Sequence, residues 1–137
     1  MKEDKLFYVA QKAFIQKGGD VLILNDPIIG LDLPGGKIQE DEYNFTEALK
    51  REVREETGLE IEIGEPFYTW YFKFKPGHRN YPKEVYLIGF RCRWISGEVQ
   101  LSDEHDSFRW VNENNYNEVD DSSEYFKALK KYFTHTK

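Results

Sequence analysis

The stretch Gly35–Leu59 reads GGKIQEDEYNFTEALKREVREETGL, and its second half has the pattern of a helix. Asn44 is a suitable N-cap residue, and Glu47 follows it at the spacing of a capping box. Gly58 can adopt the left-handed conformation that ends many helices, and Leu59 can make the hydrophobic contact that follows such an end. The stretch therefore predicts a loop that begins with two glycines, followed by a helix between Asn44 and Gly58.

The apolar and acidic side chains of this predicted helix lie on the same side. At about 100° per residue, the residues within about 60° of Glu52 are Phe45, Ala48, Leu49, Glu55 and Glu56. Lys50 and Arg54 fall on the opposite side. We therefore expect the first turns to bury an apolar stripe and the last turns to direct three carboxylates along much the same direction.

Three carboxylates on a partly buried face repel one another, and their desolvation adds to the unfavourable energy. Arg51 can reach Glu55, but one guanidinium does not neutralise three carboxylates. Oxygen ligands with no His or Cys nearby suit a hard divalent ion, Mg²⁺ or Mn²⁺. The alternative is a solvated, salt-bridged helix face, which is what a charge run usually is. The common phase of the acidic and apolar residues, and the glycine pair ahead of them, favour the metal site.

Gly36, Glu42 and the run Arg51–Leu59 (REVREETGL) resemble the signature of the Nudix hydrolases, G-x5-E-x7-R-E-U-x-E-E-x-G-U, in which U is aliphatic. Every specified residue type is present. The spacing departs from the signature once, because eight residues instead of seven separate Glu42 from Arg51. We place the extra residue near Tyr43, before the N-cap, where it lengthens the loop, keeps the helix register and changes only the reach of Glu42.

The resemblance implies a Nudix fold of the α/β class, an α/β/α sandwich around a mixed β-sheet, in a single domain over residues 1–137. It also implies a metal-dependent hydrolase that cleaves the diphosphate linkage of a nucleoside diphosphate joined to another moiety. The implied metal ligands are the carbonyl of Gly36 and the carboxylates of Glu52, Glu55 and Glu56. Arg51 would orient these glutamates and share the catalytic role with Glu52 and Glu55, while Glu42 would brace the loop.

The general base is either a signature glutamate or a residue outside the signature. Glu104, in the acidic stretch Ser102–Asp106, is the outside candidate, and its alternative role is that of a solvated loop carboxylate. His105 beside it is either a proton donor or ligand, or a histidine with a surface or packing role.

Substrate candidates come from an aromatic strand and the basic loop after it. Trp70 could stack on a nucleobase, or it could belong to the core. Arg79, Tyr81 and Lys83 could contact phosphate or sugar, or their loop could be an ordinary charged hairpin end. By resemblance to short Nudix chains, we expect a nucleoside triphosphate or a dinucleoside polyphosphate. The alternatives are ADP-ribose or a nucleotide sugar, or a non-catalytic module that senses a nucleotide.

The bulk composition limits the partners. The chain has 137 residues, 32% of them charged and 39% hydrophobic, as expected of one soluble globular domain. A net charge of −6 argues against binding long nucleic acid, although a bound metal would let it accept a small phosphorylated ligand. The single cysteine, Cys92, excludes a disulfide within the chain. No signal-peptide layout or membrane-length apolar run is present, so we expect a cytoplasmic monomer or homodimer that does not bind membranes.

The remaining pattern predicts a mixed sheet covered on both faces. The expected strands are 6–15, 21–24, 60–63, 67–74, 84–94, 99–101 and 108–111, with 84–94 central and 99–101 at an edge. Residues 17–20 are predicted to form a hairpin turn and residues 25–32 a loop. A terminal helix is predicted over residues 123–133, with fraying of residues 134–137.

Overall fold

The computed structural model describes residues 2–119 and 122–134, and over these residues the chain forms one mixed sheet and two α-helices. The strands are β1 (Tyr8–Lys17), β2 (Asp20–Asp26), β3 (Gly30–Asp32), β4 (Gly35–Lys37), β5 (Glu60–Lys73), β6 (Glu84–Ser96) and β7 (Ser107–Val111). The helices are α1 (Phe45–Thr57) and α2 (Glu124–Thr134), and a short 3₁₀ helix, η1, spans Tyr116–Glu118. Fraying was predicted for residues 134–137, but Thr134 still belongs to α2, and residues 135–137 lie outside the described residues.

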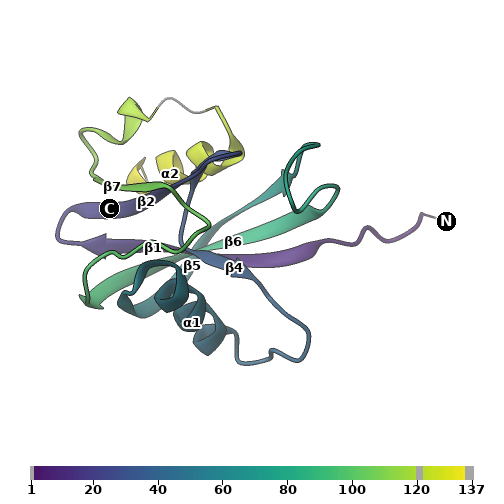
Figure 1. Cartoon of the computed structure of the whole chain (residues 1–137), viewed down its shortest axis with the longest axis horizontal. Helices are drawn as coiled ribbons and strands as arrows, with labels where there is room; N and C mark the ends of the chain where they lie inside the picture. Colours follow the sequence, from purple (N-terminus) through teal and green to yellow (C-terminus); the bar gives the residue numbers. More distant parts are fainter. Residues whose placement is uncertain (1, 120–121, 135–137) are drawn as a thin grey trace.

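β1 and β6 form the centre of the sheet. They run parallel from Tyr8 opposite Val85 to Gln16 opposite Arg93. β5 pairs antiparallel with the outer edge of β6, β4 pairs with the start of β1, and β2 pairs with its end. β2 also pairs with β3 and β7 (Figure 1). The prediction of a mixed sheet with a central strand near residues 84–94 is therefore confirmed.

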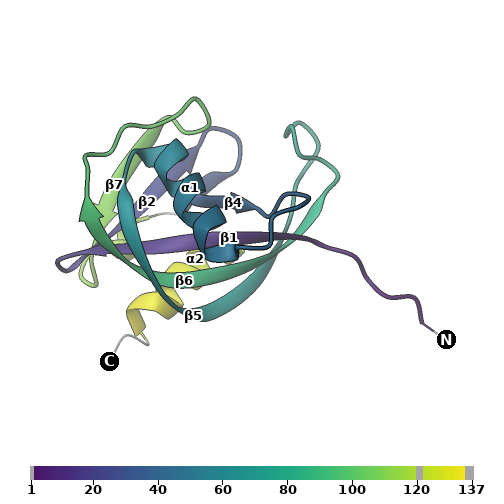
Figure 2. The ribbon, with the colours of Figure 1, turned by 90° about the horizontal axis from the view of Figure 1, so that it is seen from below.

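The two helices cover opposite faces of this sheet. Alternate residues of β1 enter different apolar clusters: Phe14 packs with residues of α2, whereas Ala13 and Ile15 pack with residues of α1. Figures 1 and 2 show α1 and α2 on the two sides of the central strands. The α/β/α sandwich predicted from the sequence is confirmed. No helix of the described residues is long and apolar enough to cross a membrane.

The limits predicted for α1 are confirmed. The side chain of Asn44 accepts a hydrogen bond from the backbone nitrogen of Glu47 at 3.2 Å. Gly58 has φ 75°, and its N–H donates to the carbonyl of Arg54. The prediction that Phe45 belongs to the buried stripe is wrong, since 45% of this residue is exposed. At this end of the helix the carbonyl of Phe45 accepts a hydrogen bond from Nε2 of Gln11, so the backbone makes the contact with β1.

Three secondary-structure predictions need correction. Residues 60–63 and 67–73 belong to the single strand β5, which shifts register near Pro66 and ends before residue 74. Residues 25–32 are not one loop, because β2 extends to Asp26 and β3 begins at Gly30. Residues 99–101 do not form an edge strand. The backbone N–H groups of Gln100 and Ser102 bond the carbonyls of Thr57 and Glu56, which have no partner within the helix at its C-terminal end.

Deleting Tyr43 should restore the signature spacing without unfolding the protein. Tyr43 is 81% exposed in the loop before Asn44, so the free energy of unfolding should change by no more than about 1 kcal/mol. Thermal melting would test this, with deletion of Ala48 as a control that shifts the helix register and buries the wrong residues. If both deletions abolish the cooperative transition, Tyr43 has a structural role that its exposure does not indicate.

Candidate active site

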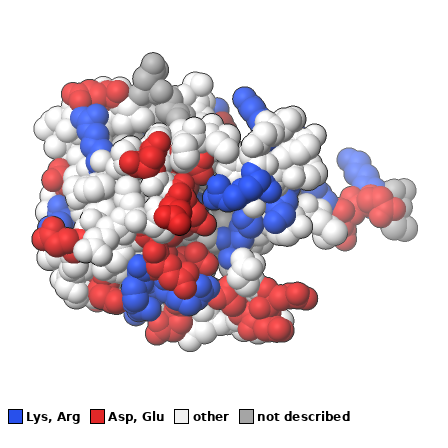
Figure 3. All heavy atoms as spheres, viewed as in Figure 1, with Lys and Arg blue, Asp and Glu red and all other residues white. Residues whose placement is uncertain are grey.

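A cavity of about 280 Å³ lies where the start of β1, β3, β4 and the end of α1 meet the loops at residues 75–83 and 102–106. Carboxylates of Glu52, Glu56 and Glu104 line it together with the cationic side chains of Lys12, Lys37 and Arg79. Figure 3 shows acidic and basic side chains side by side near the middle of this face of the molecule. The cavity therefore offers ligands for a cation next to partners for an anion.

The glycine pair allows close packing beneath the carboxylates. Gly35 has φ 136°, and a Cβ there would collide with the carbonyl of Gln11 on β1. A Cβ on Gly36 would lie 2.7 Å from Oε2 of Glu52. The two glycines therefore let β4 pair with β1 while the carboxylate of Glu52 lies directly over the backbone.

Glu56 is the most buried of the three glutamates that line the cavity, with 7% of its surface exposed. Its Oε1 accepts a hydrogen bond from the backbone nitrogen of Gly35 at 2.9 Å. Burial raises the pKa of Glu56 to about 9, although the charge of Lys12 and the bond from Gly35 oppose this. A buried carboxyl whose charged form is this unfavourable is a strong candidate to bind a cation.

Glu52 lines the cavity one turn before Glu56, and burial raises its pKa as well. Glu55 and Glu104 add to this shift by repulsion, whereas Arg51 opposes it. Glu55 itself is mostly exposed and does not line the cavity. The expected common direction of the three carboxylates therefore holds for Glu52 and Glu56, while Arg51 draws Glu55 to the outside.

Arg51 does not line the cavity, but its guanidinium forms ion pairs with three glutamates of the signature. Its guanidinium lies 2.6 Å from Glu42, 3.3 Å from Glu52 and 3.0 Å from Glu55. Glu42 also accepts a hydrogen bond from the backbone nitrogen of Gln39 at 2.8 Å. The extra residue before the helix therefore leaves Glu42 within reach of Arg51, and the loop is tied to α1.

Replacing Arg51 by alanine should weaken hydrolysis by about 10- to 100-fold, as expected for a residue that orients ligands without contacting the ion. Stability should change by no more than about 1 kcal/mol, because the Arg51 side chain is 39% exposed and its ion pairs are screened by water. Arg54→Ala is the matched control, since Arg54 lies on the same helix and pairs with Glu60 at 2.6 Å on the exposed side. Kinetics and thermal melting of both variants are the measurements. If Arg51→Ala loses the folded state while Arg54→Ala keeps it, Arg51 has a mainly structural role.

A buried charged network forms the far wall of the cavity. Lys12 on β1 lies 3.0 Å from Oδ1 of Asp32 and donates to the carbonyl of Leu33. Oδ2 of Asp32 lies 2.9 Å from Nε2 of His105. Burial alone would raise the pKa of Asp32, but Lys12 and the bond to His105 outweigh it and lower the pKa to about 2. Neither Lys12 nor Asp32 was predicted as a site residue. The signal available for Lys12 was its position within an apolar strand run.

Glu104 and Arg79 lie at the cavity, as the sequence predicted, and they face each other at 3.9 Å. Lys37 donates to the side-chain oxygen of Asn80 at 3.1 Å, and its pKa is lowered by burial and by the charges of Lys83, Lys12 and Arg79. Lys37 was not predicted as a site residue, although it follows the glycine pair directly in the sequence.

The other substrate candidates lie elsewhere. Trp70 is 5% exposed and packs against Phe14 and Tyr125 in the cluster beneath α2, so its assignment as a base-stacking residue needs correction. Tyr81 is exposed and does not line the cavity. Lys83 also does not line it, and its ammonium lies 4.9 Å from the ring of Tyr8.

The family model of the NUDIX domain matches residues 8–132, which is most of the chain. The chain belongs to the Nudix family. Nudix hydrolases are pyrophosphohydrolases, so this protein is an enzyme that acts on phosphorus-containing anhydrides. Among curated proteins, none matches the chain.

Solved Nudix structures resemble it over nearly the whole length. The MutT protein from Methanosarcina mazei Go1 is 27% identical, with a TM-score of 0.78 and 98% of each chain covered. The MutT protein from Bacillus halodurans is 25% identical, with a TM-score of 0.70, covering 95% of this chain and 82% of that one. An Ap4A hydrolase from C. elegans is 20% identical, with a TM-score of 0.73 and coverage of 94% and 97%, a likeness of fold.

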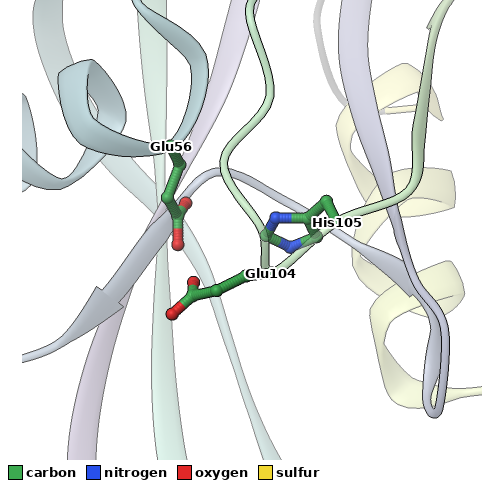
Figure 4. A group of neighbouring side chains, drawn as sticks. All are labelled: Glu56, Glu104 and His105. Atoms are coloured by element: carbon green, nitrogen blue, oxygen red, sulfur yellow. The ribbon is translucent and has the colours of Figure 1, made fainter.

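Nudix hydrolases generally use divalent metal ions, and the residues of this cavity fit one. Glu56 is a buried carboxyl, Glu52 lies over the backbone of Gly36, and Glu104 lies within 4.8 Å of Glu56 at the ligand atoms. Figure 4 shows the carboxylates of Glu56 and Glu104 and the ring of His105 gathered around one space. Carboxylate oxygens that lie this close together repel one another unless a cation lies between them.

Proposed function

We propose that this Nudix hydrolase cleaves the diphosphate linkage of a nucleoside triphosphate or a dinucleoside polyphosphate, with Mg²⁺ or Mn²⁺ as cofactor. The observation that carries the proposal is the cavity in which Glu52, Glu56 and Glu104 lie beside Lys37 and Arg79. Carboxylates alone would repel a polyphosphate, and lysines alone would not hold a metal ion. Together they suit a metal–polyphosphate complex.

Glu52, Glu56 and the carbonyl of Gly36 are the proposed ligands inside the cavity. Glu55 would join them by exchanging its contact with Arg51 for one with the ion. A bound divalent ion would neutralise the charge that develops on the phosphoryl oxygens. Arg51 would then hold Glu52 in place from outside, through its contacts with Glu52 and Glu42.

Glu104 is the proposed general base. It lies on the loop at residues 102–106, half-exposed at the cavity, where it can accept a proton from an attacking water. Glu104 contacts Arg79, and the guanidinium of Arg79 can turn towards a bound phosphate.

The density of positive charge supports a long phosphate chain as substrate. Burial lowers the pKa of Lys37, and the charges of Lys83, Lys12 and Arg79 lower it further. Because Lys12 is paired with Asp32, the cations available to phosphate are Lys37, Arg79 and Lys83. Such a group of cations suits three or more phosphates better than the two of ADP-ribose or a nucleotide sugar. The names of the similar structures, a MutT protein and an Ap4A hydrolase, are consistent with this class. Lys83 and Tyr81 remain proposed contacts for the outer part of such a substrate.

The test is a screen of phosphate and pyrophosphate release with nucleoside triphosphates, dinucleoside polyphosphates, ADP-ribose and nucleotide sugars. Hydrolysis should require Mg²⁺ or Mn²⁺, vanish in excess EDTA and be fastest with the longer phosphate chains. Turnover that persists in EDTA would exclude the metal mechanism. A preference for ADP-ribose or a nucleotide sugar would overturn the substrate class while leaving the reaction type intact.

A further inference from the structure

His105 has a buried ring nitrogen that has no hydrogen-bond partner among residues 2–119 and 122–134. The residue is 6% exposed, and its Nε2 contacts Oδ2 of Asp32 at 2.9 Å. Its Nδ1 is buried and has no hydrogen-bond partner among the residues that the structure describes. Burying a polar atom without a hydrogen-bond partner costs free energy, so a ligand that binds this nitrogen would remove the cost.

The surroundings of Asp32 determine which ring nitrogen carries the proton. Asp32 pairs with Lys12 at 3.0 Å and accepts a bond from the backbone nitrogen of Leu33 at 2.7 Å. An aspartate held by an ammonium and an N–H is ionised, and an ionised carboxylate only accepts hydrogen bonds. Nε2 of His105 must therefore donate to Asp32. In the neutral ring, Nδ1 then carries the lone pair.

The ring of His105 lies beside the acids of the cavity. Glu56, Glu104 and His105 each offer one possible ligand atom, and these three atoms lie within 4.8 Å of one another. Figure 4 shows the edge of the His105 ring turned towards the two carboxylates. The three residues come from the end of α1 and from the loop at residues 102–106, and only the fold brings them together.

We propose that Nδ1 of His105 is a nitrogen ligand of the divalent ion at this site, oriented by Asp32. The inference rests on the metal centre of the proposed function and adds a ligand that the glutamate signature does not contain. A carboxylate that holds the other nitrogen of a metal-binding histidine is a common arrangement, because it selects the tautomer and the ring orientation. A nitrogen ligand favours Mn²⁺, Co²⁺ or Zn²⁺ over Mg²⁺, so the site should bind Mn²⁺ more tightly than an all-oxygen site would.

The test uses Mn²⁺ as an electron paramagnetic resonance probe, with protein carrying either ¹⁴N or ¹⁵N histidine. Electron spin echo spectra of the wild type should show coupling to a directly bound nitrogen, and the coupling should change with the isotope. His78→Gln is the matched control, because His78 is also buried and lines the same cavity. The coupling should survive in His78→Gln.

Two substitutions of His105 separate its functions. In His105→Gln the side-chain amide can still donate to Asp32 but offers no ring nitrogen, so the coupling should vanish and Mn²⁺ affinity should fall by about tenfold or more. In His105→Asn an amide oxygen can replace Nδ1, so the preference for Mn²⁺ over Mg²⁺ should fall. Calorimetric titration with each metal gives the affinities.

Mn²⁺ binding by the wild type without nitrogen coupling would overturn the inference, whether or not either variant folds, and would leave the proposed function intact. Coupling that persists in His105→Gln would also overturn it. Failure of the wild type to bind Mn²⁺ at all would refute the metal centre and the inference together, and the hydrolysis screen would show this independently.

Discussion

Glu56→Gln is expected to lower hydrolysis by on the order of 10³-fold. The amide can still accept the hydrogen bond from Gly35, so the loop over α1 should keep its position. What is lost is the negative charge that Glu56, a buried proposed ligand, would present to the metal ion. Steady-state kinetics on the substrate found by the screen is the measurement. Activity within about tenfold of the wild type would mean that Glu56 is not a ligand.

The same substitution should stabilise the protein when no metal is bound. The pKa of Glu56 is raised from 4.5 to about 9, so the folded state keeps the proton up to a higher pH than the unfolded state. The contribution of Glu56 to wild-type stability is therefore greatest below pH 4.5 and falls as the pH rises from 4.5 to about 9. Glutamine does not titrate, so at pH 7 in EDTA the variant should be more stable by about 1–3 kcal/mol.

Metal should reverse this order. The wild type gains RT ln(1 + [M]/Kd) from Mg²⁺, and the variant gains less. Glu55→Gln is the control for stability in EDTA, since Glu55 is mostly exposed and its charge is solvated. Melting curves of all three proteins at pH 5, 7 and 9, each with EDTA and with Mg²⁺, test both statements. Equal gains from Mg²⁺ in the wild type and in Glu56→Gln would place the metal elsewhere.

Lys12→Met should destabilise the fold by about 3–5 kcal/mol, the effect of removing one partner of a buried ion pair. The side chains of Lys12 and Asp32 are 8% and 9% exposed, so the substitution leaves a charged carboxylate in a region from which water is largely excluded. Methionine has nearly the length of lysine, which limits any loss of packing. The loss should therefore be electrostatic, and it should shrink at low pH, where Asp32 in the variant can be protonated.

Lys127→Met is the control for this change. Lys127 pairs with Glu124 on α2 at 2.6 Å, but its side chain is 63% exposed, so its loss should alter stability by no more than about 1 kcal/mol. Denaturant unfolding of both variants at pH 4 and pH 7 provides the free energies. Equal effects of the two substitutions would show that water reaches the Lys12–Asp32 pair and screens it.

The sequence alone determined the helix α1 and the acids it carries. Asn44 and Gly58 mark the two ends of this helix through contacts with residues three or four positions away. The burial of Ala48 and Leu49 follows from helical phase. Such signals act over one or two turns and need no knowledge of distant segments. The same phase placed Glu52 and Glu56 at the cavity, and the resemblance carried by REVREETGL identified the family that the comparison then showed.

Only the tertiary structure decided which residues complete the site. Trp70 lies on the face of β5 that packs beneath α2, and alternation shows which residues share a face but not whether that face meets a cavity or a helix. Glu55 has the phase of a ligand, yet Arg51 holds it outside. Lys12, Asp32 and His105 are far apart along the chain, and each gains its role only from a neighbour that the fold supplies. Long-range electrostatic pairing of this kind leaves no periodic signal in a sequence, because the energy of a buried charge depends on its partner in space and not on its place in the chain.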